Sequence, residues 1–215
     1  QCLLYRNNLT LIIYVDDVGI AAPDRATINQ FLDELTQLDY ELTRETSFNE
    51  FLGLKMEHQA DGSINMTQRG LIEKIISATG LTDCNPNWVP AAPTTLGRDP
   101  DGPRSTETWN YKSIVGMLLY LNTNSRPDIA FAVSQIARFG HDPRQSHAVA
   151  VKTLVRYLKR TKDKGMIVKA SKSFDLKCYA DADFSGLYNS DPQEDATSAR
   201  SRTGIIITLA EIPLI

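Results

Sequence analysis

A stretch of fifteen residues, Leu9–Pro23, constrains the fold of this chain more than any other. It reads LTLIIYVDDVGIAAP, with the apolar runs Leu11–Val15 and Val18–Ala22 on either side of Asp16 and Asp17. The β-branched and aromatic residues of both runs predict strands, so we expect the acidic pair at the tight connection of a hairpin. Two adjacent carboxylates repel each other there, which favours a divalent cation with oxygen ligands as their partner.

Two other interpretations of the acidic pair need to be weighed. In the first, Asp16 and Asp17 only hydrogen-bond the local backbone, as Asx turns do. In the second, they belong to a phosphoacceptor receiver domain, which needs a further acid at the end of a second buried strand. The next Asp outside a helix-like stretch is Asp61, in the turn Asp61-Gly62, and no buried strand precedes it. This excludes the receiver domain and leaves the local turn open.

Five blocks of the sequence, taken together, resemble one known family. Tyr14-Val15-Asp16-Asp17 resembles the Y-x-D-D box of reverse transcriptases. The rest of the chain is similar, in the same order, to the pol polyprotein of copia-type LTR retrotransposons. The further blocks are Phe51-Leu52-Gly53-Leu54 with Met66-Thr67-Gln68, then Tyr111–Leu121, Arg126–Ala130 and Tyr179–Gly186. One Y-x-D-D is a weak signal, whereas collinear blocks over nearly the whole chain are specific.

The resemblance implies an α+β fold in several parts. Residues 1–82 are expected to form the C-terminal half of a polymerase palm, made of antiparallel hairpins and a helix around Tyr14–Asp17. Residues 83–107, rich in proline, are expected to be a connection. Residues 108–164 resemble the helical thumb and connection, and residues 165–215 the truncated opening strands of an RNase H-like α/β domain.

The same resemblance implies a function. The implied function is that of a fragment of an RNA-directed DNA polymerase with RNase H. In the intact protein, this polymerase transfers nucleotides by a two-metal mechanism with Mg²⁺ or Mn²⁺. Asp16 and Asp17 are the implied catalytic and metal-binding residues of the polymerase. Asp181 is the implied catalytic and metal-binding residue of the RNase H-like site, with Asp183 as its alternate. The implied partners are an RNA template, a DNA primer or RNA–DNA hybrid, dNTP and the remainder of the pol polyprotein, in cytoplasmic virus-like particles and without a membrane.

An alternative is a non-catalytic remnant or a nucleic-acid-binding module without polymerase activity. Two-metal catalysis needs carboxylates from at least two strands, and Asp16 and Asp17 supply one side. In the family another Asp comes from a strand well upstream, and this chain starts with Gln1, like the interior of a protein. We therefore expect no polymerase activity from these 215 residues alone.

Charge is distributed unevenly, although the formal net charge is only −3. From Arg144 to Lys177 ten Lys and Arg residues face only Asp163 and Asp175. A basic segment of this kind fits an enzyme that acts on a polyanion, and a solvated helix face is the competing interpretation. We expect nucleic acid to contact Tyr14, Gly53, Lys152, Arg156, Lys159 and Arg160. Gly53 is included because glycine permits close approach of a nucleic-acid backbone.

Hydrophobic periodicity and turn residues predict the remaining elements. The expected strands and helices, in chain order, are a helix over 28–38 after Asp24, a hairpin of Phe51–Glu57 and Ile64–Gln68 around Asp61-Gly62, a helix over Gly70–Thr79 that ends before Gly80, helices over 111–121, 127–137 and 148–158, and strands over 166–169, 176–180 and 203–209. Pro127 is expected to open one helix and Ser146 to cap the next. Residues 187–202 are expected to form a polar loop.

Composition excludes several other classes. A chain with 42% hydrophobic and 23% charged residues is ordinary for a soluble globular protein. No apolar run approaches the roughly 20 residues that span a bilayer. Cys2, Cys84 and Cys178 are odd in number and far apart, which argues against a disulfide framework and against a zinc site.

Overall fold

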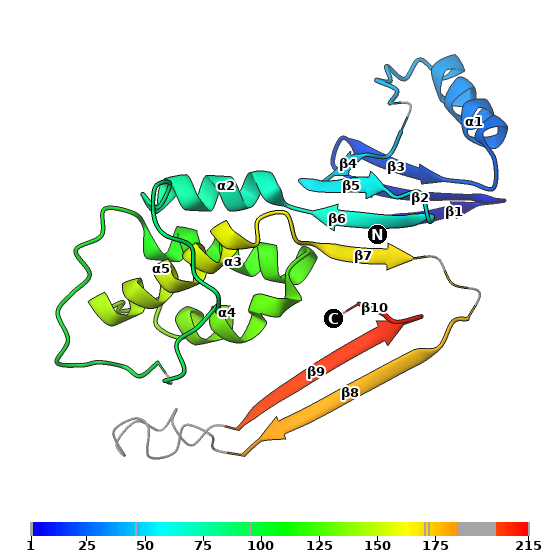
Figure 1. Cartoon of the computed structure of the whole chain (residues 1–215). Helices are drawn as coiled ribbons and strands as arrows, with labels where there is room; N and C mark the ends of the chain where they lie inside the picture. Colours follow the sequence, from blue (N-terminus) through cyan, green and yellow to red (C-terminus); the bar gives the residue numbers. More distant parts are fainter. Residues whose placement is uncertain are drawn as a thin grey trace. The chain divides into compact units, whose positions relative to one another are not determined.

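The structure, a computed structural model, describes residues 2–45, 47–94, 96–169, 171, 173–184 and 201–214. These residues form a mixed α+β fold with antiparallel sheets and five α-helices (Figure 1). The chain divides into two compact units, unit 1 with residues 1–52 and unit 2 with residues 53–215. The loop expected over residues 187–202 lies, except for its last two residues, outside the described part of the chain.

Unit 1 contains the predicted acidic hairpin and the helix after it. Its elements are β1 (Leu3–Arg6), β2 (Leu9–Tyr14), β3 (Asp17–Ala21), α1 (Arg25–Gln37) and β4 (Glu50–Phe51). The first three strands form an antiparallel sheet in the order β1-β2-β3. Alternation along β2 directs Leu9 and Leu11 to one face, where they form a small core with Phe31 of α1. Asp24 caps α1 by accepting a hydrogen bond from the Thr27 N–H at 2.8 Å.

Unit 2 begins with the predicted hairpin around Asp61-Gly62. Its strands are β5 (Leu54–His58) and β6 (Ser63–Thr67), and β7 (Met166–Lys169) pairs antiparallel with β6. We expected β7 to open the last part of the chain, but its partner is about 100 residues earlier, with Met66 opposite Met166. Gly165 makes this pairing possible, because a Cβ atom there would collide with the Met66 carbonyl.

The strand expected over Phe51–Glu57 is interrupted by a turn. Leu52 and Gly53 have φ angles of 53° and 72°. Two successive residues with positive φ are typical of a type I′ turn, in which glycine is strongly favoured. Gly53 therefore belongs to a turn between β4 and β5, and its own backbone conformation is a sufficient reason for glycine at this position.

Five helical segments of unit 2 cover the four predicted helices, because the helix expected over 127–137 is divided into a 3₁₀ turn and an α-helix. They are α2 (Arg69–Ala78), α3 (Tyr111–Asn124), the 3₁₀ helix η1 (Pro127–Ile129), α4 (Ala130–Ala137) and α5 (Gln145–Arg160). Their apolar stripes pack into one core, which includes Ile72, Leu118, Val133 and Leu154. The predicted stop of α2 is confirmed: Gly80 has φ 68°, and its N–H and that of Leu81 bond to the Ser77 and Ile76 carbonyls, a Schellman motif.

The start of α5 differs from our prediction, since its N-cap is Arg144 and not Ser146. The Arg144 backbone N–H donates to Nδ1 of His147 at 2.8 Å. Nδ1 is thus an acceptor, and Nε2 carries the proton that is donated to the Gly97 carbonyl at 2.8 Å. Ser146 instead donates its hydroxyl hydrogen to Asp99 at 2.6 Å. The Pro-rich segment before α3 therefore takes part in capping α5.

A buried guanidinium joins the end of α3 to the end of α5. Arg126 is 1% exposed and forms two parallel hydrogen bonds of 2.8 Å with Asp128. It also donates to the Thr161 carbonyl at 3.0 Å and to the Thr161 hydroxyl at 2.7 Å. Tyr157 donates to Asp128 at 2.8 Å. Burial acts to raise the pKa of Asp128, but these hydrogen bonds outweigh it and lower the pKa below its ordinary value.

The last strands form a second sheet of unit 2. β8 (Leu176–Asp183), β9 (Arg202–Leu209) and β10 (Ile212–Pro213) are antiparallel in the order β10-β9-β8. β8 extends three residues beyond the predicted end, to Asp183. Across the described part of the chain, no helix has both the length and the apolar character that a membrane span requires.

Replacing Arg126 with alanine is expected to destabilise unit 2 by about 1–3 kcal/mol, because the buried carbonyl and hydroxyl of Thr161 would lose their donor. Both tryptophans, Trp88 and Trp109, lie in unit 2, so urea unfolding followed by their fluorescence measures this unit. Arg69→Ala is the matched control, since that guanidinium is exposed and its ion pairs lie at the surface. Similar urea midpoints for both variants would contradict the role of Arg126.

The stability of unit 2 is expected to fall as the pH drops below about 6.5, the ordinary pKa of histidine. Burial lowers the pKa of His147, against the opposing effects of Gly97 and Asp99. The unfolded chain therefore binds a proton before the folded one does, and acid favours unfolding. His147→Asn keeps an acceptor for the Arg144 N–H and should remove this pH dependence. An unchanged slope of unfolding free energy against pH in the variant would contradict this account.

Candidate active site

The acidic pair lies at the predicted hairpin, with the two-residue connection one residue earlier than the sequence indicated. β2 and β3 pair from Thr10 opposite Ala21 to Tyr14 opposite Asp17. Only Val15 and Asp16 are left to reverse the chain. Asp16 therefore occupies the turn itself, and Asp17 is the first residue of β3. A rigid two-stranded ladder thus fixes the backbone on both sides of the two carboxylates.

Val15 has an unfavourable backbone conformation. Its φ angle is 56°, and Asp16 is not among the residues with positive φ. This sign pattern is that of a type II′ turn, whose first central residue is normally glycine. A β-branched residue at positive φ is strained, and strain of this kind is concentrated at functional sites. The side chain of Val15 is 86% exposed, so packing does not account for the conformation.

The carboxylates of Asp16 and Asp17 are exposed and open to a ligand. In the described part of the chain neither of them accepts a hydrogen bond or forms an ion pair, so the alternative of a local Asx turn has no support. Adjacent carboxylates offer the hard oxygen ligands that Mg²⁺ prefers. The described residues nevertheless contain no group of three or more His, Cys, Asp or Glu side chains that could hold a metal ion. The pair fits a cation as a partial set of ligands.

Asp181 lies on β8 of unit 2, opposite Gly204 of β9. Asp183 is two residues further along the same strand, so both carboxylates project from one face of the sheet. Both residues are exposed. As at the acidic hairpin, the described residues place no third potential ligand beside them.

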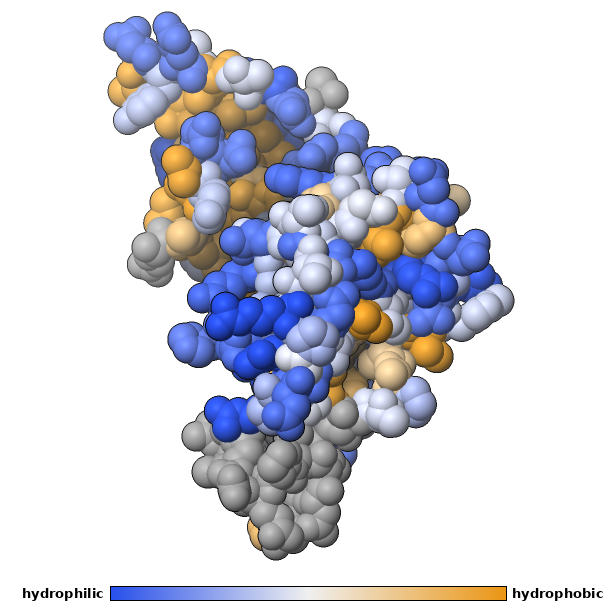
Figure 2. Space-filling view, turned by 90° about the vertical axis from the view of Figure 1, so that its left-hand side faces the viewer, coloured by the Kyte–Doolittle hydropathy of each residue, from blue (hydrophilic) through white to orange (hydrophobic). Residues whose placement is uncertain are grey.

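Tyr14 lies on the face of the β1-β2-β3 sheet that α1 does not cover. Its side chain is 54% exposed, and Leu3, Tyr5 and Ile12 of the same face are 39%, 71% and 43% exposed. Figure 2 shows apolar side chains gathered on the surface of unit 1. Tyr14 is therefore exposed next to the carboxylates in sequence, and its contact with nucleic acid stays a prediction.

The basic face of α5 has partners that the sequence did not suggest. Lys159 donates from Nζ to the carbonyls of Thr82 and Cys84, at 2.6 Å and 2.7 Å. Arg156 donates from Nε to the Asn85 carbonyl at 2.6 Å. These bonds attach the first part of the Pro-rich segment to the helix. Carbonyl oxygens have no signature in sequence spacing, which is why the contacts could not be predicted.

The other two predicted bases, Arg160 and Lys152, have different kinds of partner. The Arg160 guanidinium lies 3.0 Å from the centroid of the Trp88 ring. Lys152 forms an ion pair with Glu107 at 2.5 Å, so its charge is compensated. In the described part of the chain, Lys159 and Arg156 bond to neutral carbonyls and Arg160 lies against a ring, so no carboxylate compensates their positive charge.

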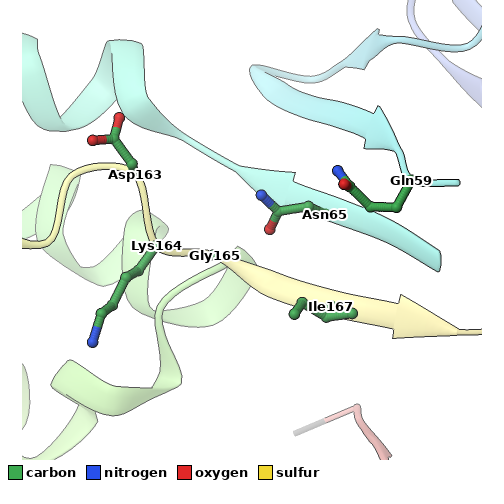
Figure 3. A pocket seen from close by; sticks show the side chains of 6 residues that line it. All are labelled: Gln59, Asn65, Asp163, Lys164, Gly165 and Ile167. Atoms are coloured by element: carbon green, nitrogen blue, oxygen red, sulfur yellow. The ribbon is translucent and has the colours of Figure 1, made fainter. Parts of the chain in front are cut away.

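A shallow hollow of about 390 Å³ lies between β6, β7 and the loop after α5 (Figure 3). Gln59, Asn65, Asp163, Lys164, Gly165 and Ile167 line it. The Asp163 and Lys164 side chains point away from each other, and Asp163 is bound to Arg69 at 2.8 Å. The polar groups that line the hollow do not converge on a common point, so we do not regard the hollow as a catalytic site.

Comparison with known proteins relates the chain to reverse transcriptases. Residues 3–93 match the family of reverse transcriptases (RNA-dependent DNA polymerases). Over 95% of its length the chain is 30% identical to the retrovirus-related Pol polyprotein from transposon RE1 of Arabidopsis thaliana, of which it covers 13%. It is 27% identical to the corresponding polyprotein from transposon TNT 1-94 of Nicotiana tabacum, with 95% of the chain and 15% of the relative covered.

A shorter relative shows the same likeness. Over 83% of its length the chain is 27% identical to a transposon Ty5-1 protein of Saccharomyces cerevisiae, of which it covers 58%. No solved structure matches the chain. The family match includes Tyr14–Asp17, and the two Pol polyproteins align with nearly the whole chain. Residues 3–93 thus belong to the reverse transcriptase family, and the chain is a relative of the reverse transcriptase region of copia-type retrotransposon Pol polyproteins.

Proposed function

We propose that this chain is part of an RNA-directed DNA polymerase with RNase H that acts within a retrotransposon pol polyprotein. The observation that carries the proposal is the pair of exposed, unpartnered carboxylates at the β2–β3 turn, within the residues that match the reverse transcriptase family. The proposed partners are an RNA template, a DNA primer or RNA–DNA hybrid, dNTP and the rest of the polyprotein. Cytoplasmic virus-like particles are the proposed location.

The proposed chemistry assigns different tasks to neighbouring residues. Asp16 and Asp17 would bind Mg²⁺ or Mn²⁺, which supplies charge neutralisation and activation of the attacking hydroxyl when bound. The β2–β3 ladder fixes the backbone on both sides of the two carboxylates, so only their side chains need to reorient when a ligand arrives. Tyr14 lies one residue before the turn and would contact nucleic acid. A further carboxylate must come from elsewhere, since the described residues supply no third ligand.

We further propose how the parts correspond to those of the family. Residues 1–82 would form palm structure, residues 108–164 thumb and connection, and residues 165–215 the opening of an RNase H-like domain with Asp181 as a metal ligand. Two acids on one face of β8 support the last assignment. The pairing of β7 with β6 shows that residues 166–169 also complete the sheet of residues 54–67.

A second candidate function is nucleic-acid binding without catalysis. The observation that favours it is the uncompensated charge of Arg156, Lys159 and Arg160 on α5, together with the lack of a third metal ligand among the described residues. Under both candidates these bases contact phosphates, a contact that depends strongly on salt and little on sequence.

We expect the 215-residue chain alone to extend no primer with Mg²⁺, because two carboxylates are too few for two-metal catalysis. A longer polyprotein segment containing these residues should extend a primer on an RNA template. Asp16→Asn or Asp17→Asn should lower that extension rate about 100-fold or more, the size of effect expected for lost charge stabilisation.

Asp39→Asn is the matched control, since Asp39 is an exposed carboxylate of unit 1 away from the turn, and its φ of 63° suits asparagine. Extension by the short chain that depends on Asp16 would contradict the need for further ligands. Full extension by the longer Asp16→Asn enzyme would contradict the site itself.

Affinity for an RNA–DNA duplex is expected to fall steeply with salt and to weaken when Lys159 and Arg160 are both changed to glutamine. Glutamine at position 159 keeps a donor for the Thr82 carbonyl while it removes the charge. Each lost phosphate contact should reduce the slope of log affinity against log salt by roughly one. Fluorescence anisotropy of a labelled duplex over a series of KCl concentrations measures this slope.

Lys152→Gln is the control for that experiment, because the charge of Lys152 is already compensated by Glu107. Its salt slope should stay close to that of the parent chain. An equal reduction by Lys152→Gln, or an affinity that does not change with salt, would show that the uncompensated bases do not bind phosphate.

A further inference from the structure

Trp88 is an exposed tryptophan on a segment that is firmly attached to α5. We call residues 82–89 the docked segment. The side chain of Trp88 is 74% exposed, although a ring of this size is usually buried in large part. Val89 beside it is 52% exposed. The question is why the chain displays this ring to solvent.

The backbone next to Trp88 is bonded to the helix rather than free. Besides the bonds from Lys159 and Arg156 to the carbonyls of the docked segment, the Asn87 N–H donates to the Arg156 carbonyl at 3.1 Å. The Asn87 side chain accepts from the Trp88 N–H at 3.0 Å and donates to the Val89 carbonyl at 3.1 Å. These contacts fix the backbone that carries the exposed ring, so little backbone entropy is lost when a ligand binds there.

The surroundings of the ring are positively charged. Arg160 lies against the ring, with its guanidinium carbon 3.0 Å from the centroid. Lys159 and Arg156 lie one and four residues earlier on α5 and bond to neutral carbonyls. The docked segment itself contains a single acid, Asp83. An anionic ligand with a flat ring would therefore match both the charge and the shape of this surface.

We propose that Trp88 stacks on a base of single-stranded nucleic acid, while Arg156, Lys159 and Arg160 contact the phosphates of the same strand. Sites for single strands combine aromatic rings on which bases stack with cations that follow the backbone. Arg160 strengthens such a stack, because it lies against the ring and neutralises charge close to it. Docking of a protein would call for a wider apolar surface than Trp88 and Val89 provide.

The inference rests on the proposed function only for the class of ligand, since it needs nucleic acid to bind but no polymerase or RNase H activity. Trp109→Phe leaves Trp88 as the sole tryptophan and permits a direct measurement at the ring. A titration with an oligothymidylate should quench its fluorescence, whereas inorganic polyphosphate of equal charge should bind with little quenching. The reciprocal variant, Trp88→Phe, should lose the quenching but keep most of the affinity.

Trp88→Ala is expected to weaken oligothymidylate binding about 5- to 100-fold, the loss of one base stack, and to leave polyphosphate binding within about twofold. Phe174→Ala removes another exposed aromatic ring of unit 2 and should change neither affinity. Circular dichroism and thermal melts confirm that each variant is folded. If the oligonucleotide binds with unchanged affinity in Trp88→Ala, the stacking proposal is wrong and the phosphate contacts stand. If the oligonucleotide does not bind to the parent chain at all, both the stacking proposal and the phosphate contacts are wrong.

Discussion

The two-residue connection between β2 and β3 is the constraint on which the candidate active site depends. Because Tyr14 pairs with Asp17, only Val15 and Asp16 reverse the chain, and Val15 adopts a φ angle of 56° to do so. The two carboxylates are thereby held on adjacent residues and exposed to solvent, and no cation of the described chain is paired with them. Repulsion between them and strain at Val15 both oppose this arrangement, and a bound divalent cation would relieve the repulsion.

The helix α5 serves two purposes through its two faces. Its apolar stripe, which includes Val151 and Leu154, packs into the core of unit 2. Its opposite face bonds to backbone carbonyls of the docked segment through Arg156 and Lys159. A cation that is paired with a neutral carbonyl keeps its charge, unlike Lys152 beside Glu107. The fold can therefore use these side chains structurally and still present a positive surface to a polyanion.

Local patterns were sufficient to predict part of this structure. The stripe of α5 and the stop of α2 before Gly80 follow from helical periodicity and from the conformational freedom of glycine, and both are confirmed. The prediction of Ser146 as a cap was wrong, because α5 begins earlier, with Arg144 as N-cap and its N–H bonded to the buried ring of His147. The pairing of β7 with β6 and the carbonyl partners of Lys159 join residues far apart in sequence, so no local pattern reveals them.

The most direct test of the central claim is to locate the cation on the chain itself. Mn²⁺ is added to isotope-labelled protein, and the paramagnetic broadening of backbone amide signals is mapped by NMR. We expect broadening centred on Val15–Val18 at low Mn²⁺ concentration, and its loss in an Asp16→Asn, Asp17→Asn variant that keeps the hairpin. Broadening that is uniform along the chain, or that persists around the turn in the variant, would contradict a cation site at these two carboxylates.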